Sequence, residues 1–316
     1  MIRFYQNLYQ KFAEALFRPN PYTWVYGLTR SILALGTLIT LAFSSVDVLF
    51  DDAIFHEVNA KYLFSDFNFF MIFGWDHLGL AKAIAMVILL LTASGLYPRM
   101  TGLLQWWIAS SFFYSSSIIE GGDQINAIIC LLLVPLTLLD NRRWHWETGD
   151  FSENKRFVGN LAFVLITVQM AMVYLNAASD KIYAATEEWK LGNAFYYYVN
   201  DSYFAYPDWM DPLMEQLLAN SFIVSSLTWG TILLELVLFG VLFSNKRVKF
   251  ALFPIAAIFH LGIAIFLGLV SFFMAMLAGL IIYLVPKDLP PPKILRRWGD
   301  SSSGPVPGGA QEVAPA

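Results

Sequence analysis

The sequence predicts an all-α protein, a polytopic bundle of about eight membrane-spanning helices. Of its 316 residues, 57% are hydrophobic and only 14% are charged, with a mean hydropathy of +0.55. A soluble domain carries about 25% charged residues. The apolar residues also gather in runs that approach the ~20 residues a helix needs to cross a bilayer. Composition and run length therefore both favour a protein whose first partner is the lipid bilayer.

An interfacial helix is expected over residues 1–20, ahead of the first span. Apolar and aromatic side chains recur there at helical spacing, among Arg3, Lys11 and Arg18. Such a stripe is typical of a helix lying on a membrane surface. The segment has neither the short apolar core nor the small-residue cleavage site of a signal peptide, so we do not expect it to be removed.

Eight apolar segments then predict one transmembrane domain over residues 21–285. They cover residues 25–43, 78–97, 101–119, 124–140, 157–178, 221–243, 248–267 and 270–285. The last two form one continuous run, divided here at Gly268–Val270, and a single span in their place would give seven. Residues 286–316 are rich in Pro, Gly and Ser, which predicts a disordered cytoplasmic tail.

The distribution of positive charge favours eight spans over seven. With eight spans and an inner N-terminus, fifteen of the 20 Lys and Arg residues fall in inner segments, three in outer loops and two within spans. Positive residues concentrate on the cytoplasmic side of membrane proteins. Seven spans would place the cluster at 287–297 outside. We therefore predict a multi-pass protein of the cell membrane with both termini in the cytoplasm.

The most unusual segment lies where the span over 157–178 ends. Lys181 follows that span, and Trp189 and Gly192 come shortly after it. Hydrocarbon does not tolerate such polar groups, and an outer lysine runs against the charge bias. A lysine partly desolvated by apolar walls can act as a base. The alternative is a side chain that reaches the outer surface.

Four polar residues within the predicted spans are candidates for a structural or functional role. Arg30 and Glu235 lie within one helical turn of each other in depth, which predicts an ion pair, although Arg30 could also extend to the inner surface. His260 and Gln169 are predicted to form a polar layer near the midplane. For His260 the alternatives are an interhelical hydrogen bond and a role in catalysis.

Asp123 follows Gly121 and Gly122 in a short outer loop. One interpretation is a helix cap. The other is a carboxylate at the outer mouth of a cavity, facing Lys181.

The sequence offers little for other classes of site. The one cysteine, Cys130, excludes a disulfide or a CxxC pair within the chain. The spacing of His and Cys does not indicate a metal site, and we expect no nucleic-acid partner.

Three motifs resemble the HTTM domain, the membrane domain related to vitamin K-dependent gamma-carboxylase. They are Lys181-Ile182 followed by Trp189 and Gly192, GGDQIN at 121–126 followed by an apolar span and Asp140, and FHLGIAIFLGLVSFFMAMLAGLIIYL at 259–284. The resemblance covers residues 20–285. The N-terminal NPYTWVYGLTRSILALGTLITL is most similar to the sporulation-delaying protein SdpB family within that group.

The resemblance implies two functions. The SdpB-like function is a factor that, with a small partner protein, matures or exports a secreted antimicrobial peptide from its precursor. The carboxylase-like function is a quinone-linked enzyme in which Lys181 occupies the position of the base, on the extracytoplasmic side. The chain has no counterpart of the carboxylase's large lumenal portion. A transporter or structural membrane protein is the third alternative, and no paired broken helices in matching halves support transport.

Overall fold

The fold is described from a computed structural model. It describes residues 13–53, 65–118, 120–183, 186–201 and 206–292, together with residues 6, 10, 55 and 204. Residues 13–17 are helical, whereas half of the predicted interfacial helix over 1–20 and most of the predicted tail over 286–316 lie outside the described residues.

All regular secondary structure among the described residues is helical, apart from one isolated β-bridge between Leu96 and Trp144, which confirms the all-α prediction. The long helices are α2 (Trp24–Phe43), α6 (Leu78–Ser94), α7 (Pro98–Ser115), α8 (Gly121–Leu138), α9 (Glu153–Tyr183), α13 (Ser221–Gly240), α14 (Lys246–Leu267) and α15 (Val270–Leu284). The short elements are α3 (Val46–Leu49), α5 (Phe69–Phe73), α10 (Glu188–Leu191), α11 (Ala194–Val199), α12 (Asp211–Leu218), η1 (Ser65–Phe67), η2 (Trp75–His77), η3 (Asp208–Met210) and η4 (Val241–Phe243).

Six of these helical segments are long and apolar enough to cross a membrane: α2, η2 with α6, α8, α9, α13 with η4, and α14. The other two predicted spans also form helices, but they fall short of that standard. Helix α7 contains Arg99, Gln105 and several serines, and α15 has 15 residues, about 22 Å of helix. A crossing by all eight helices therefore stays a prediction.

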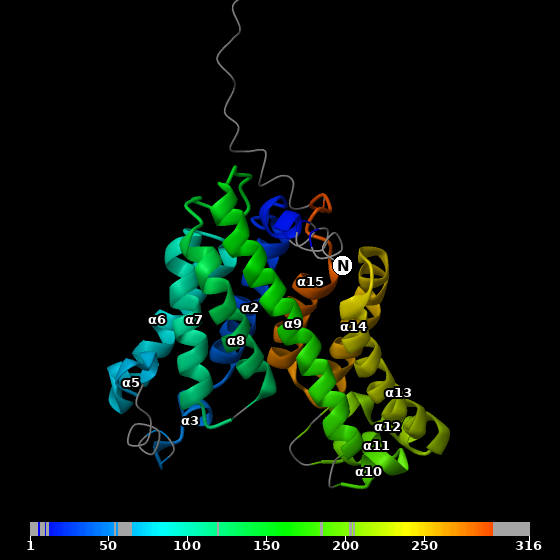
Figure 1. The fold of residues 1–316 in the computed structure, drawn as a ribbon. Coiled ribbons are helices and arrows are strands. Elements are labelled where there is room, and N and C mark those ends of the chain that lie inside the picture. The colour runs from blue at the N-terminus through cyan, green and yellow to red at the C-terminus, as the bar shows by residue number, and fades with distance from the viewer. Residues whose placement is uncertain are drawn as a thin grey trace, which may run out of the picture.

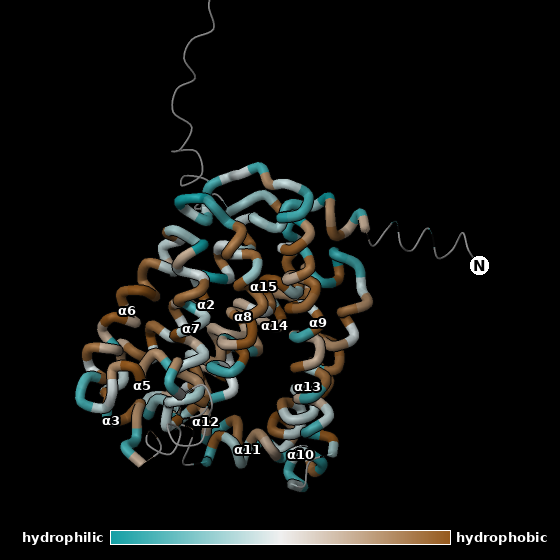
Figure 2. Tube along the Cα trace, turned by 60° about the vertical axis from the view of Figure 1, so that its left-hand side comes forward, coloured by the Kyte–Doolittle hydropathy of each residue, from teal (hydrophilic) through white to brown (hydrophobic). Residues whose placement is uncertain are grey.

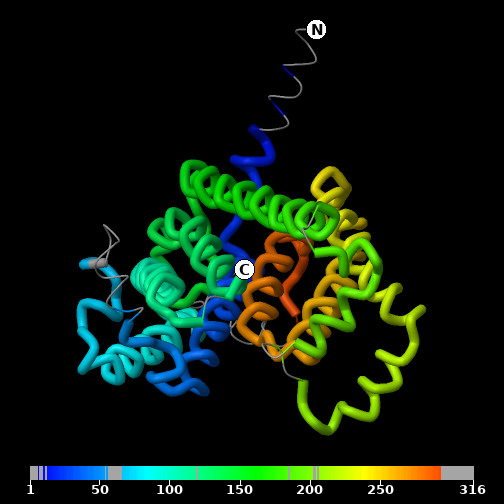
Figure 3. The backbone as a smooth tube through the Cα atoms, turned by 90° about the horizontal axis from the view of Figure 1, so that it is seen from below, coloured from blue at the N-terminus to red at the C-terminus, as the bar shows by residue number. Residues whose placement is uncertain are grey.

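Helix α15 lies at the centre of the bundle. It packs against α2, α8, α9 and α14, while α6 and α7 continue the bundle on one side and α13 packs on α9 at the other. Figure 1 shows α9 crossing this arrangement diagonally, and Figure 3, seen from below, shows the same long green helix running across one side of the bundle. Hydrophobic residues dominate the helices, whereas hydrophilic residues gather in the loops at the ends (Figure 2).

The predicted division between the last two helices is a real break. Helix α14 ends at Leu267, and Gly268 adopts a positive φ of 72°, a conformation that glycine takes without steric cost. The N–H groups at the start of α15 then need new partners. The Glu120 carboxylate supplies one, because it accepts from the Phe272 N–H at 3.2 Å and from the Ser271 hydroxyl.

Helix α8 packs against α15 at the same place in close backbone contact. A Cβ added at Gly122 would lie 2.4 Å from the Cα of Phe272, whereas one added at Gly121 would meet nothing within 4 Å. A glycine is therefore required at Gly122 for packing, but not at Gly121.

We expect Gly122→Ala to lower the stability of the detergent-solubilised protein by about 1–3 kcal/mol, because the added methyl group meets backbone that cannot rotate away. Gly121→Ala is the matched control and should leave the apparent Tm unchanged or slightly raised, since alanine favours helix. A melt of Gly122→Ala that coincides with that of Gly121→Ala would contradict the close approach of α8 and α15.

Candidate functional site

Helices α9 and α13 bring a lysine and a carboxylate together where α9 ends. Tyr174, Ala178 and Lys181 occupy one face of α9, because residues three, four and seven apart share a helical face. From this face the Lys181 ammonium donates to Glu235 Oε1 of α13 at 2.8 Å and to the Ala177 carbonyl at 3.2 Å. The lysine and glutamate side chains are only 19% and 8% exposed. The two charges therefore neutralise each other in a largely dry site.

The loop after α9 covers this ion pair with an aromatic ring. Lys181 Nζ lies 5.1 Å from the centre of the Trp189 ring, within the range of a cation–π contact. Gly192 ends the short helix α10 with a positive φ of 74°, and a Cβ there would lie 2.7 Å from Nε1 of Trp229. Gly192 thus lets the loop turn close against α13, so that Trp189 can reach Lys181.

A second polar pair lies on the same face of α9. The Tyr174 hydroxyl lies 3.0 Å from Nε2 of His260, which projects from α14. The ring of Phe272 packs edge-on against the imidazole, at 5.6 Å between centroids. His260 also lies close enough to Lys181 for the two to interact electrostatically.

Two atoms of this cluster are buried without a hydrogen-bond partner: Oε2 of Glu235 and Nδ1 of His260. Whether Tyr174 donates to Nε2 or accepts from it, Nδ1 keeps one unused hydrogen-bonding position. Buried polar atoms without partners are costly and are found where a ligand or water completes them. The cluster of Tyr174, Lys181, Glu235 and His260 is therefore the candidate functional site. It is called the outer cluster hereafter, after the side of the membrane that the sequence predicts for Lys181.

The ion pair also limits what Lys181 can do. A neutral amine can accept a proton, whereas an ammonium that donates to a carboxylate has no free electron pair. In this arrangement Lys181 is a positioned cation. It becomes a base only when its proton has moved away.

The structure does not pair Asp123 with Lys181. Asp123 lies in the first turn of α8, 6% exposed and one turn from Glu120, whose carboxylate holds the start of α15. Lys181 donates to Glu235 rather than to Asp123. Asp123 is thus not the N-cap of α8, which is Glu120, and the carboxylate that binds Lys181 comes from α13, while a place for Asp123 at the mouth of a cavity stays a prediction.

The predicted ion pair between Arg30 and Glu235 is also wrong. Arg30 donates to Nδ1 of His145 at 3.0 Å and to the Thr101 hydroxyl at 2.9 Å. Equal depth in the membrane does not bring two side chains together unless their helices are also neighbours. Helix α2 packs against α6 and α15, whereas α13 packs against α9. The two side chains lie on different sides of the bundle.

The partner of Arg30 is a neutral histidine. Burial, together with the charges of Arg30 and Arg142, lowers the pKa of His145 well below its ordinary value. Nδ1 therefore accepts from Arg30, and the proton on Nε2 faces the Ser31 hydroxyl at 3.4 Å. This network holds α2 to the loop after α8 and has a structural role.

The polar layer of His260 and Gln169 is wrong in its second member. The partner of His260 is Tyr174, five residues beyond Gln169. Five residues rotate a helix by about 140° beyond one full turn, so the two side chains cannot share a face. Sequence reasoning missed Tyr174, because a tyrosine in an aromatic-rich span looks like core. Its position seven residues before Lys181 was the available signal.

The described residues contain no group of three or more His, Cys, Asp or Glu side chains placed to hold a metal ion.

A double-mutant cycle tests the ion pair. Lys181→Met and Glu235→Gln should each destabilise the protein by on the order of 2–3 kcal/mol, because each leaves a buried group without its partner. The double variant should cost at least about 1 kcal/mol less than the sum of the two. Apparent Tm values in detergent measure all three.

Arg30→Gln combined with Glu235→Gln is the control, and its effects should add because the residues do not touch. A non-additive Arg30–Glu235 pair, or an additive Lys181–Glu235 pair, would reverse the assignment made here.

The chain was compared with family models, solved structures and curated proteins. No family model matches it. No solved structure matches it either. Two curated proteins of Bacillus subtilis (strain 168) do match. The uncharacterized protein YitO is 34% identical over 280 residues, which cover 85% of this chain and 87% of that protein. The sporulation-delaying protein SdpB is 35% identical over 271 residues, covering 84% and 83%. With such identity across most of both lengths, the chain belongs to the family that contains SdpB and YitO.

Proposed function

We propose that this chain is an SdpB-like membrane factor that matures or exports a secreted antimicrobial peptide. Membership of the SdpB family supports the proposal. The observation that carries it is the outer cluster. There Glu235 Oε2 and His260 Nδ1 are buried without hydrogen-bond partners, and the Trp189 ring of the loop after α9 covers Lys181. These are an acceptor and a polar ring atom, and they match the amide and hydroxyl groups of a peptide.

The proposal includes an orientation. The chain is a multi-pass protein of the cell membrane with eight spans, and both termini and the loop at 139–152 are cytoplasmic. The outer cluster then faces the extracytoplasmic side, together with α10, α11 and α12, which lie at the opposite end from the loop at 139–152 (Figure 1). The bias of Lys and Arg toward the end that carries the loop at 139–152 supports this orientation.

Reporter fusions test the orientation. Fusions after Asp150 and at residue 300 should report the cytoplasm, and fusions near Tyr206 should report the outside. A paired reporter, alkaline phosphatase against green fluorescent protein, gives opposite signals at each site and so controls for expression. An outside signal at residue 300 would remove one span and with it the eight-span arrangement.

A quinone-linked carboxylase-like enzyme is the second candidate function. His260 Nδ1 favours it, because in the tautomer whose Nε2 accepts from Tyr174 this atom is a buried donor beside the Phe272 ring, which suits the carbonyl and ring of a quinone. Such a cofactor would supply redox chemistry, and Tyr174 would hold the His260 ring in place. The ion pair opposes this candidate, since it keeps the proton of Lys181 in place. We therefore rank it below peptide handling.

Variants of Lys181 separate the two functions. The chain is co-expressed with a candidate secreted peptide precursor, and the secreted peptide is analysed by mass spectrometry. Lys181→Arg keeps a cation within reach of Glu235 but cannot act as a base, because a guanidinium does not lose its proton. Lys181→Ala loses both properties. Lys190→Ala, an exposed lysine of the same loop, is the matched control.

Peptide handling without a lysine base predicts normal peptide with Lys181→Arg and Lys190→Ala, and at least a tenfold loss with Lys181→Ala. Base catalysis predicts a loss with Lys181→Arg as well, together with a wild-type product that has gained one carboxyl group. Membrane levels of every variant are measured in parallel. Normal peptide from Lys181→Ala at normal membrane level would remove the outer cluster from either function.

A further inference from the structure

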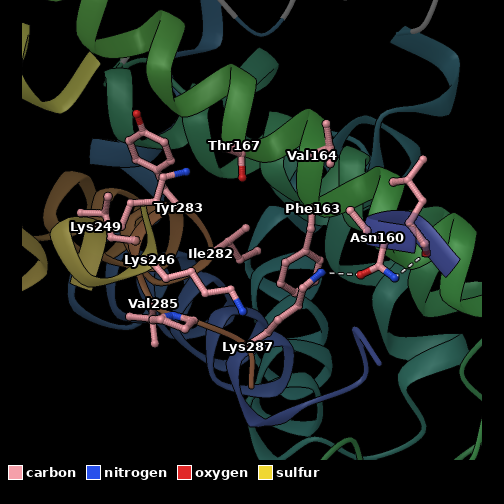
Figure 4. Close-up of a pocket in the computed structure, with 14 residues that line it drawn as sticks. Asn160, Phe163, Val164, Thr167, Lys246, Lys249, Ile282, Tyr283, Val285 and Lys287 are labelled. Atoms are coloured by element: carbon pink, nitrogen blue, oxygen red, sulfur yellow. Dashed lines mark hydrogen bonds between the residues drawn. The ribbon is translucent and has the colours of Figure 1, made fainter. Parts of the chain in front are cut away.

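A second site lies at the other end of the bundle. A cavity of about 340 Å³ opens between α9, α14 and the end of α15 (Figure 4). Its lining includes Asn160, Phe163 and Val164 from α9, Lys246 and Lys249 from α14, and Lys287 just after α15. Neither proposed function uses this cavity.

The cavity has an excess of positive charge. Lys246 pairs with Asp288 at 2.8 Å, but both side chains are mostly exposed, and exposed pairs are weak enough to exchange for a better anion. Lys249 lies 5.6 Å from the centre of the Tyr283 ring and Lys287 donates to the amide oxygen of Asn160, so neither has a described carboxylate partner. Among the described residues, the lining thus holds three ammonium groups, of which one is paired with a carboxylate.

Lys287 is the most constrained of the three. Burial, with the nearby charge of Lys246, lowers the pKa of Lys287 to about 8. Its ammonium also lies 5.2 Å from the centre of the Phe163 ring, which belongs to the lining of the cavity. A negative group placed between Lys246 and Lys287 would relieve their repulsion.

The walls of the cavity are apolar and continue onto the lipid-facing side of α9. Phe163, Val164 and Ile282 line the cavity. Val164 is 40% exposed, and Leu161, Leu165 and Val168 beside it on α9 are also exposed. A ligand that fits both the lysines and the apolar wall carries an anionic head and an apolar tail. A free phosphate would use the lysines and leave the apolar wall bare.

We propose that this cavity binds one anionic phospholipid, with its phosphate among Lys246, Lys249 and Lys287 and an acyl chain along Val164 of α9. Basic pockets between helices at the membrane surface bind such headgroups. With the orientation proposed above, the lipid belongs to the cytoplasmic leaflet. The binding itself does not depend on that orientation or on the function of the outer cluster.

Native mass spectrometry of the full-length protein tests the proposal. The protein is purified in detergent, stripped of lipid and mixed with phosphatidylglycerol or with phosphatidylcholine of the same acyl chains. The test variants are Lys249→Gln/Lys287→Gln and Val164→Trp, the second of which fills the cavity and keeps every charge. Their controls are Arg99→Gln/Arg143→Gln, which removes two exposed cations outside the lining, and Val87→Trp on an exposed face of α6.

The wild-type protein and both controls should retain one phosphatidylglycerol. Retention should fall about fivefold for each lysine removed, since a lysine near an anionic surface contributes about 1 kcal/mol, and Val164→Trp should reduce it as well. Lys249→Arg/Lys287→Arg, which keeps the charges, should restore retention and shows that the lysine variants are not simply misfolded.

Equal retention by all variants would mean ordinary surrounding lipid and would overturn the proposal. Equal retention of phosphatidylcholine would do the same. If excess inorganic phosphate displaced the lipid completely, the site would be one for a soluble anion, and the phospholipid proposal would be wrong.

Discussion

The fold depends on the contact between the Glu120 carboxylate and the start of α15. The chain breaks at Gly268 inside an apolar run, which leaves the backbone N–H groups at the start of α15 without partners from a preceding turn of helix. Glu120 accepts from Phe272 N–H and from Ser271 Oγ, and Gly122 lets α8 approach closely enough for this to happen. One carboxylate thus makes a helix of only 15 residues stable at the centre of the bundle.

The position of α15 then arranges the functional groups. Because α9 and α14 both pack on α15, Tyr174 and His260 are brought within hydrogen-bond distance. Phe272, whose N–H Glu120 binds, also carries the ring that packs on His260. The Glu120 carboxylate, at the start of α8, therefore supports the outer cluster without belonging to it.

Much of the fold could be predicted from the sequence, but the partners in the site could not. Apolar run lengths located the helices, including the division at Gly268, and the charge anomaly located Lys181, Glu235 and His260 as residues of interest. Depth along a helix is one coordinate, however, and packing supplies the other two. The pairing of Arg30 with Glu235 failed for this reason, since their helices are not neighbours in the bundle. Tyr174 was missed because its role depends on where α14 packs.

The balance of charge distinguishes the two ends of the molecule. In the outer cluster Lys181 and Glu235 cancel, so its unfilled atoms select for hydrogen bonding rather than for charge. At the other cavity three lysines line the wall, Asp288 is the one described carboxylate that pairs with any of them, and the apolar wall of α9 continues into the cavity. Charge alone would attract any anion, and an apolar wall alone would accept any acyl chain. Only the combination selects an anionic lipid, which would anchor α9, α14 and α15 relative to one another at the end opposite the outer cluster.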